Sequence, residues 1–299
     1  MIEQGIHDGI APSRYHAWAF RPGKTSGPIS CSVLKRYANL GPLAFRWAPE
    51  RSGTRAMSWG SLVDCLLFTP ELFPREFVCK EQNPFLSEDG GVRSKEAKQW
   101  AAERREEGAV FIKEEDRDHA LQAVERLRNT PVAAEILEGA RFQIALSYTG
   151  QAEIPVKCLV DIVPEHFDHD DCLADLKTTA VNIHDDDALA RQVGKFGYHW
   201  QAAMYLFTWN QLSADKRRRW KIVWQSANPP YEVRVTELDS LWLDQGRAAV
   251  MAHMARLVRD IKTDTWRSPF QDAETTLDLH TPTQWAEERA LEILEEIEK

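Results

Sequence analysis

The sequence predicts an α/β protein in which a mixed central β-sheet is flanked by helices. Three observations lead to this fold class: three strand-like segments follow one another between residues 141 and 177, a long helical pattern comes next, and two further strand-like segments precede another helix. This order of elements is typical of a sheet covered by helices. With 299 residues, 43% of them hydrophobic and 28% charged, the chain has an ordinary globular composition and can bury a substantial core.

The first half of the chain is predicted to be mainly helical. Residues 1–28 are polar and contain scattered Gly and Pro, so we expect a polar N-terminal arm, with a single domain and its helical additions over residues 29–299. The expected elements are helices at 30–47 and 58–73, a loop that could close over a channel at 80–95, and mainly helices over 96–139.

The second half is predicted to contain the sheet. Segments rich in β-branched residues are separated by polar, turn-like stretches, whereas the helical segments show apolar residues at helical spacing. The expected strands are near 141–148, 156–163, 172–177, 221–226 and 231–236, and the expected helices are near 186–209, 238–262 and from 282 onward.

The most informative motif is formed by Asp161 and a following Asp-x-Lys triplet, Asp175 to Lys177. Asp161 lies in one predicted strand and the triplet lies in the next, and a polar turn separates them, so a hairpin is expected. Side chains alternate between the two faces of a strand, so Asp175 and Lys177 should share a face. A cross-strand neighbour can then bring Asp161 to the same point.

Two carboxylates and an ammonium at one point suit metal-dependent phosphodiester hydrolysis. Mg2+ prefers oxygen ligands, and a pair of such ions can stabilise both the attacking water and the leaving oxygen. Asp161 and Asp175 would bind metal together with the Leu176 carbonyl, while Lys177 would stabilise developing charge or help to deprotonate the water. Alternatively, the two acids are hairpin-end carboxylates and Lys177 is an exposed strand residue.

The predicted helix after these strands carries Gln201 and Tyr205 four residues apart, and therefore on one helix face. The order Asp161, Asp175-x-Lys177, Gln201-x-x-x-Tyr205 resembles the PD-(D/E)xK nuclease superfamily. It is most similar to the RecB-like branch and, within it, to the RecE-type exonucleases of phages and prophages, with lambda exonuclease more distant. Other segments are also similar to this family in sequence and order: Ser30 to Lys35, Trp59 to Phe73, Gly197 to Gln201, Pro229 to Tyr231, and Trp266 to Trp285.

Two positions depart from the pattern of this family. Asp64 stands where RecE-like proteins carry a metal-binding His and lambda exonuclease a Glu. A carboxylate still suits Mg2+, so we expect Asp64 to be a metal ligand, the alternative being a helix acid without that role. Gln143 stands in a strand where relatives often carry a Glu, and it is left out of the predicted site.

The resemblance implies a restriction-endonuclease-like core and a Mg2+-dependent exodeoxyribonuclease, with Mn2+ as a substitute ion. It also implies 5' to 3' digestion of one strand of linear double-stranded DNA, a single-strand annealing protein as partner, and a ring-shaped homo-oligomer. Gln201 and Tyr205 would position the strand near the scissile phosphate. An endonuclease on the same core, or a non-catalytic DNA-binding or assembly protein that kept the scaffold, remain alternatives.

The net charge of -9 requires local basic patches if the chain is to bind DNA, because phosphate binding depends on Lys and Arg. The first candidate patch is Lys216, Arg217, Arg218 and Arg219, and the second is Arg51 with Arg55. The basic run can also be explained as a solvated helix end whose charge suits the helix dipole.

The remaining composition points to a cytoplasmic enzyme without an iron-sulfur cluster. The five cysteines form no CxxC pair, and none follows Cys172, whereas related nucleases that bind a cluster carry cysteines near the C-terminus. The chain has no apolar run of the length that a membrane span needs, and residues 1–21 lack the apolar core of a signal peptide.

Overall fold

A computed structural model describes residues 2–10, 12–49, 55–166, 169 and 171–268, apart from the side chains of residues 12, 13 and 55–58. Residues 1–266 form one compact unit; of the other unit, residues 267–299, only Arg267 and Ser268 are described. The helix expected from residue 282 onward therefore lies outside the described residues.

The N-terminal half contains the following elements: β1 (Gly5–His7), α1 (Pro12–Ala17), η1 (Pro22–Lys24), α2 (Cys31–Leu40), α3 (Pro42–Arg46), α4 (Arg55–Phe68), η2 (Pro70–Leu72), α5 (Phe73–Glu76), β2 (Phe77–Cys79), η3 (Lys80–Gln82), α6 (Lys95–Glu106), β3 (Val110–Ile112), α7 (Glu114–Asn129) and α8 (Pro131–Leu137). The C-terminal half contains β4 (Arg141–Thr149), β5 (Pro155–Val163), β6 (Cys172–Thr179), α9 (Asp186–Phe196), α10 (Tyr198–Leu212), β7 (Arg219–Ser226), β8 (Val233–Glu237) and α11 (Ser240–Thr263).

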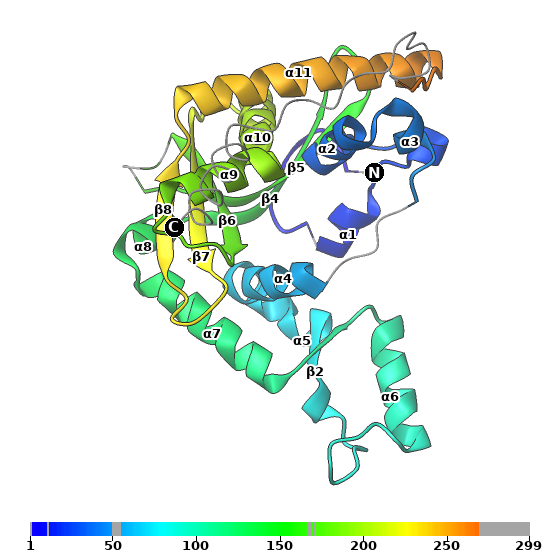
Figure 1. The fold of residues 1–299 in the computed structure, drawn as a ribbon, viewed down its shortest axis with the longest axis vertical. Helices are drawn as coiled ribbons and strands as arrows, with labels where there is room; N and C mark the ends of the chain where they lie inside the picture. Colours follow the sequence, from blue (N-terminus) through cyan, green and yellow to red (C-terminus); the bar gives the residue numbers. More distant parts are fainter. Residues whose placement is uncertain (1, 11, 50–54, 167–168, 170, 269–299) are drawn as a thin grey trace, which may run out of the picture. The chain divides into compact units, whose positions relative to one another are not determined.

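The central sheet has six strands in the order β1-β4-β5-β6-β7-β8. All neighbours are antiparallel except β6 and β7, which are parallel and connected through α9 and α10. Helices α9, α10 and α11 cover one face, and α4 and α7 lie on the other (Figure 1). The α/β class with a mixed, helix-flanked sheet is thus confirmed.

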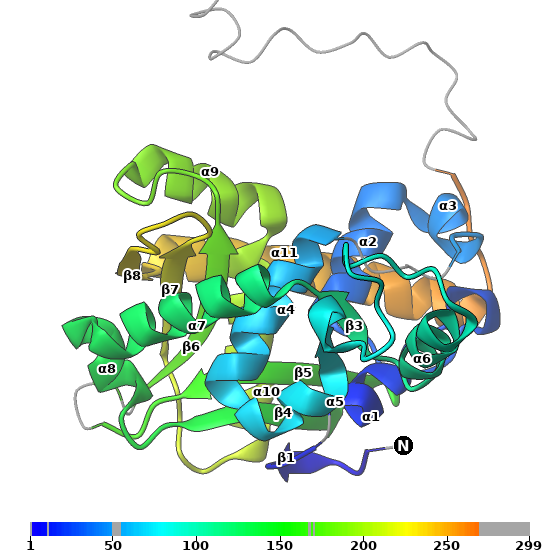
Figure 2. The same ribbon diagram turned by 90° about the horizontal axis from the view of Figure 1, so that it is seen from below.

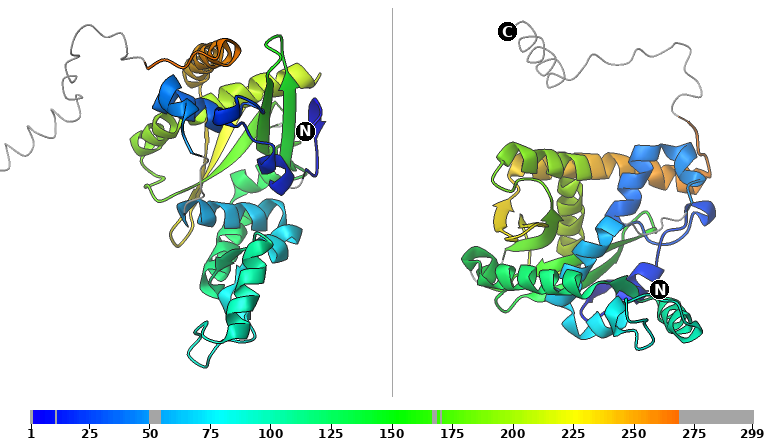
Figure 3. Two further views of the ribbon diagram at one scale, coloured as in Figure 1. Left: turned by 90° about the vertical axis from the view of Figure 1, so that its right-hand side faces the viewer. Right: turned by 60° about the horizontal axis from the view of Figure 1, so that its bottom comes forward.

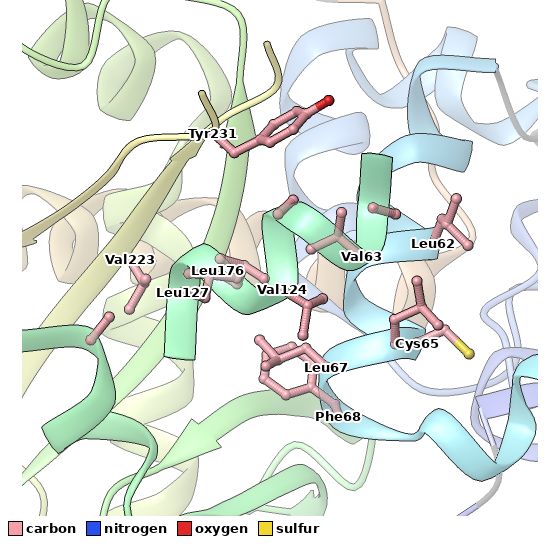
Figure 4. Close-up of a cluster of buried hydrophobic side chains, with 14 of the residues drawn as sticks. Leu62, Val63, Cys65, Leu67, Phe68, Val124, Leu127, Leu176, Val223 and Tyr231 are labelled. Atoms are coloured by element: carbon pink, nitrogen blue, oxygen red, sulfur yellow. The ribbon is translucent and has the colours of Figure 1, made fainter. Parts of the chain in front are cut away.

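Each face of the sheet has its own apolar core. The core under α4 and α7 includes Val63, Leu127 and Leu176, all at most 5% exposed (Figure 4). The core under α10 and α11 is built around Trp209, Trp220 and Trp224, each 1% exposed. Strand β6, which carries Asp175 and Lys177, contributes side chains to both cores.

A smaller extension lies beyond α4. It contains the two-stranded parallel sheet β2-β3 and helix α6, which Figures 2 and 3 show beside α5. Neither of these strands was predicted, since each has only three residues and the pairing partners are more than 30 residues apart in sequence. The expected loop at 80–95 contains η3 and then turns without longer regular structure.

The segment expected to be a polar N-terminal arm contributes to the sheet and the core. Strand β1 pairs antiparallel with β4, and Ile2, Tyr15 and Phe20 are at most 7% exposed. Lys157 of β5 donates hydrogen bonds from its ammonium to the carbonyls of Tyr15 (2.7 Å) and Trp18 (2.5 Å). This buried ammonium links α1 to the sheet.

Two predicted helices are each divided at a glycine. Gly41 separates α2 from α3, and Gly197 separates α9 from α10. Gly197 has φ +60°, a left-handed conformation that ends a helix and favours glycine. The break lets α10 start a new direction, with its first turn, Tyr198 to Gln201, at the level of the Asp-x-Lys triplet on β6.

The packing of α10 against α11 depends on Gly246, and its replacement should be costly. A Cβ at this position would lie 2.2 Å from the His199 carbonyl oxygen, which is backbone and cannot rotate away. We expect Gly246→Ala to lower the free energy of unfolding by about 1–3 kcal/mol. The matched change Gly194→Ala, whose Cβ would be 3.9 Å from Trp242, should stabilise by up to about 1 kcal/mol through helix propensity. Urea unfolding of both variants measures these changes. Equal changes in the free energy of unfolding would mean that α10 and α11 can move apart to admit a methyl group at position 246.

No helix within the described part of the chain combines the length and the apolar character required to cross a membrane.

Candidate active site

The candidate site lies where β5 and β6 separate. These strands are registered only at Ile162 and Ala174, although β6 pairs with β7 along its whole length. Past that point the Leu176 amide donates to the Asp161 carboxylate (3.2 Å) instead of to a backbone carbonyl of β5. The N–H and C=O of one residue in a strand point to the same edge, so the Leu176 carbonyl also faces the Asp161 side. The side chain of Asp161 thus occupies the gap between the strands.

Strand β4 is irregular at the residue that faces Asp161. Gln143, directly opposite Asp161, has φ +52°, which is uncommon for a residue other than glycine. The pairing register is the same on both sides of it, so no residue is inserted. The faces nevertheless exchange, because Val160 belongs to the core under α10 while Ile162 belongs to the core under α4. Asp161 sits at this exchange, and the Gln143 side-chain amide donates to its carboxylate (3.2 Å).

Asp175 is the most enclosed acid of the site, with 1% of its surface exposed. One carboxylate oxygen, Oδ1, accepts a 2.6 Å hydrogen bond from the Gln201 side-chain amide. The other, Oδ2, is in an ion pair with the Lys177 ammonium. The Lys177 ammonium also lies 4.9 Å from the centre of the Tyr198 ring. Asp175 and Lys177 therefore lie on one face of β6, as expected from side-chain alternation. The first turn of α10 contacts both of them through Gln201 and Tyr198.

Burial and neighbouring negative charges disfavour the ionised forms of Asp161 and Asp64. Burial, with the neighbouring charges of Asp175 and Asp64, raises the pKa of Asp161 well above its usual value. Burial also raises the pKa of Asp64 to about 7, Lys177 partly opposing this and Asp175 adding to it. Burial would lower the pKa of Lys177, but the charges of Asp175 and Asp161 outweigh it and raise that pKa.

The donor set fits a hard divalent cation, though it is not a complete ligand cage. Asp161 and Asp175 are close enough for a side-chain hydrogen bond, and Asp64 of α4 is near enough for its charge to raise the Asp161 pKa. In the described residues, no three or more His, Cys, Asp or Glu side chains already form a group that could hold a metal ion. A cation would relieve the crowding of the carboxylates, and Asp175 Oδ2, which faces the Lys177 ammonium, is an oxygen that it could use.

Tyr205 is placed differently from Gln201. Its residue surface is 9% exposed, it belongs to the core under α10, and its ring packs edge-to-face on Trp220 at 5.8 Å. Burial raises the pKa of its hydroxyl well above the usual value. The Tyr205 ring therefore lies in the apolar core under α10, whereas the Gln201 side chain reaches Asp175.

The predicted basic run is largely engaged within the protein. Arg217 is 2% exposed, and its guanidinium donates to the carbonyls of Pro164 (2.8 Å) and Cys172 (3.4 Å) and pairs with Asp215. Arg219 pairs with Asp171 and Glu237. A guanidinium enclosed in this way cannot reach a phosphate, so Arg217 has a structural role.

Two other residues of the predicted basic run, Lys216 and Arg218, are exposed. The Lys216 ammonium donates a hydrogen bond to the Ser213 carbonyl (2.7 Å). Arg51 lies outside the described residues, as does the side chain of Arg55.

Two residues of the site, Gln143 and Tyr198, were not in the predicted set. Gln143 could have been found from the hairpin register, because it is the residue of β4 opposite Asp161. Tyr198 lies three residues before Gln201, and therefore on the same side of α10.

The fold of this chain is similar to that of a known protein. A solved structure of a candidate exonuclease from Eubacterium rectale superposes with a TM-score of 0.56 at 15% identity, covering 94% of this chain and 98% of its own. The alkaline exonuclease LHK-Exo from Laribacter hongkongensis is less similar, with a TM-score of 0.27 at 17% identity over 65% of this chain and 95% of its own. No match was found among the curated proteins.

The fold assignment rests on the first of these structures and on a family match that covers most of the sequence. Residues 36–274 match the family described as PDDEXK-like domain of unknown function (DUF3799). This range contains all of the residues that converge on the gap between β5 and β6. By sequence and by fold, the chain belongs to this PDDEXK-like family.

Proposed function

We propose that the protein is a metal-dependent deoxyribonuclease that hydrolyses phosphodiester bonds. The observation that carries this proposal is the convergence of Asp161, Asp175 and Lys177 at the gap between β5 and β6. A scaffold needs none of these groups there, because crowding two acids in a partly buried gap costs folding free energy.

The proposed metal ligands are Asp64, Asp161, Asp175 and the Leu176 carbonyl. When bound, Mg2+ or Mn2+ would supply electrostatic stabilisation of the phosphate and would activate water. The chain's own contribution is to hold the carboxylates in place: Gln201 fixes one oxygen of Asp175, and Gln143 and the Leu176 amide fix Asp161. Preorganised acids lose little entropy on binding an ion.

The proposed role of Lys177 is charge stabilisation. Its raised pKa keeps the ammonium protonated at neutral pH, which suits a group that stabilises the charge developing on a phosphate. Deprotonation of water by Lys177 would instead require a lowered pKa. The Tyr198 ring restricts the ammonium to the side of the site on which Asp175 lies.

The finer proposal is an exonuclease of the RecE type that digests linear double-stranded DNA from 5' to 3' in the cytoplasm. The support is the motif order in the sequence, together with a structural neighbour that is described as an exonuclease. The same proposal includes a ring-shaped homo-oligomer and a single-strand annealing protein that receives the 3' strand.

The test is digestion of linear duplex DNA labelled at the 5' or the 3' end, with Mg2+ and separately with EDTA. We expect early release of short labelled products from the 5' label only, and none in EDTA. Covalently closed circular DNA should resist digestion. Cutting of the circle would instead identify an endonuclease, and no cutting of any substrate with Mg2+ or Mn2+ would favour a non-catalytic DNA-binding protein.

A further inference from the structure

Two clefts are lined by residues of the candidate site, one by Asp64 and the other by Tyr198, and they differ in charge. One, of about 390 Å3, is lined by Asp64 and Gln143 and also by the acids Glu76 and Glu107. The other, of about 660 Å3, lies between α2 and the break from α9 to α10. Its lining includes Lys35, Arg36 and Lys195 and contains no Asp or Glu. In a chain of net charge -9, a cleft with three cations and no acid is a marked local exception.

The second cleft also contains aromatic rings, one of them well exposed. Phe196 is 44% exposed although it is a large apolar residue. Its ring stacks on that of Tyr198, with centroids 5.7 Å apart and planes at 25°. Trp200 and Trp242 also line this cleft. A stacked pair with an accessible outer ring extends a platform onto which another flat ring can be added.

The position of the cleft connects it to the candidate active site. Tyr198 belongs to both, because its ring lies 4.9 Å from the Lys177 ammonium and 6.0 Å from that of Lys35. Lys35 also donates to the Phe196 carbonyl (2.8 Å), which fixes α2 against the end of α9. A polymer whose phosphate reached Asp175 and Lys177 would meet Tyr198 next and then Phe196.

From these observations we infer that the cleft between α2 and the α9–α10 break binds a single strand of nucleic acid, with a base stacked on Phe196 and phosphates near Lys195 and Arg36. The inference rests on the proposed function for the identity of its ligand. Aromatic platforms and cations are the combination with which proteins hold single strands without reading sequence. A duplex would hide its base faces inside its own stack, so the exposed Phe196 ring favours an unpaired strand.

The test is binding of a fluorescently labelled oligothymidylate to the full-length protein in EDTA, where cleavage cannot interfere. Phe196→Ala should weaken binding about 5- to 100-fold, and Phe196→Trp should restore it. Lys195→Ala should reduce the slope of log K against log salt by about 0.7. The matched controls are Phe207→Ala, which removes a ring that is 56% exposed outside this cleft, and Lys98→Ala, which removes an exposed lysine of α6 outside this cleft.

The outcomes separate this inference from the nuclease proposal. Equal binding by the Phe196→Ala and Phe207→Ala variants would overturn the stacking platform, and so would binding by Phe196→Leu that is as tight as binding by Phe196→Trp. Neither result would contradict hydrolysis of DNA in Mg2+. An unchanged salt slope for Lys195→Ala would overturn the phosphate contact. Selective weakening by Phe196→Ala in a protein that digests no DNA would support the cleft and reject the nuclease.

Discussion

Replacing Lys177 by alanine should reduce Mg2+-dependent hydrolysis of DNA by about 1000-fold or more, and Asp175→Asn should do the same. The two losses have different physical reasons. Lys177→Ala removes the ammonium that faces the reacting phosphate in our proposal. Asp175→Asn removes an anionic oxygen from the proposed ion site, although the side chain keeps its size and can still bond with Gln201.

Ion binding should distinguish the two variants. The Lys177 ammonium forms an ion pair with Asp175, whose side chain is 2% exposed. Lys177→Ala leaves that carboxylate buried without a cation, so we expect the free energy of unfolding to fall by about 3 kcal/mol in EDTA. Mg2+ or Ca2+ should restore much of this loss, because a divalent cation replaces the missing charge. Asp175→Asn should gain little from either ion.

The measurements are initial rates on end-labelled duplex DNA and thermal unfolding with and without the divalent ions. Lys98→Ala, which removes an exposed lysine of α6, serves as the control for loss of a lysine that lies outside the site. Hydrolysis within tenfold of the wild-type rate by either variant would remove the basis of the proposed function. Equal ion-induced stabilisation of the two variants would show that Asp175 is not a ligand.

The sequence was sufficient to predict the sheet and the approach of Lys177 to Asp175, because both depend on local patterns. Strand periodicity placed β4 to β8 to within a few residues, and the period of two put Asp175 and Lys177 on one face. Helical spacing placed Gln201 and Tyr205 on one side of α10. In the structure their environments differ, because Gln201 bonds to Asp175 whereas Tyr205 packs on Trp220, a contact between α10 and β7 that helical spacing does not predict.

What the sequence could not predict depends on tertiary contacts. The left-handed backbone at Gln143 cannot be read from a glutamine, since this residue type rarely adopts it. The basic run looked like a DNA patch because four cations adjoin, and only the fold reveals that acids and carbonyls enclose Arg217. Strand β1 was missed because three residues next to a turn carry too little periodicity.

The stability of the ion-free protein should depend on pH through Asp64. In the unfolded chain its carboxyl ionises near pH 4, whereas burial raises the pKa to about 7 in the folded protein. Below pH 4 the group is protonated in both states and costs nothing. As pH rises from 4 to 7 the unfolded state releases its proton first, so folding becomes less favourable.

Asp64→Asn should remove this dependence, because an amide does not titrate. Relative to that variant, the free energy of unfolding of the wild-type protein in EDTA should decrease by up to roughly 4 kcal/mol between pH 4 and pH 8. Urea unfolding at several pH values measures the difference directly. Glu125→Gln, which changes an exposed acid on α7 to an amide, is the control and should follow the wild type.

The direction of the effect is the decisive part of this prediction. An ordinary ion-paired acid is stabilising above its pKa, so its removal would make the protein relatively less stable at high pH. Asp64 should do the opposite, because its charge is opposed by burial and by Asp175 and only partly compensated by Lys177. Parallel curves for wild type and Asp64→Asn would mean that the carboxyl is solvated, and Asp64 would then lose its place beside Asp161 and Asp175 in the proposed ion site.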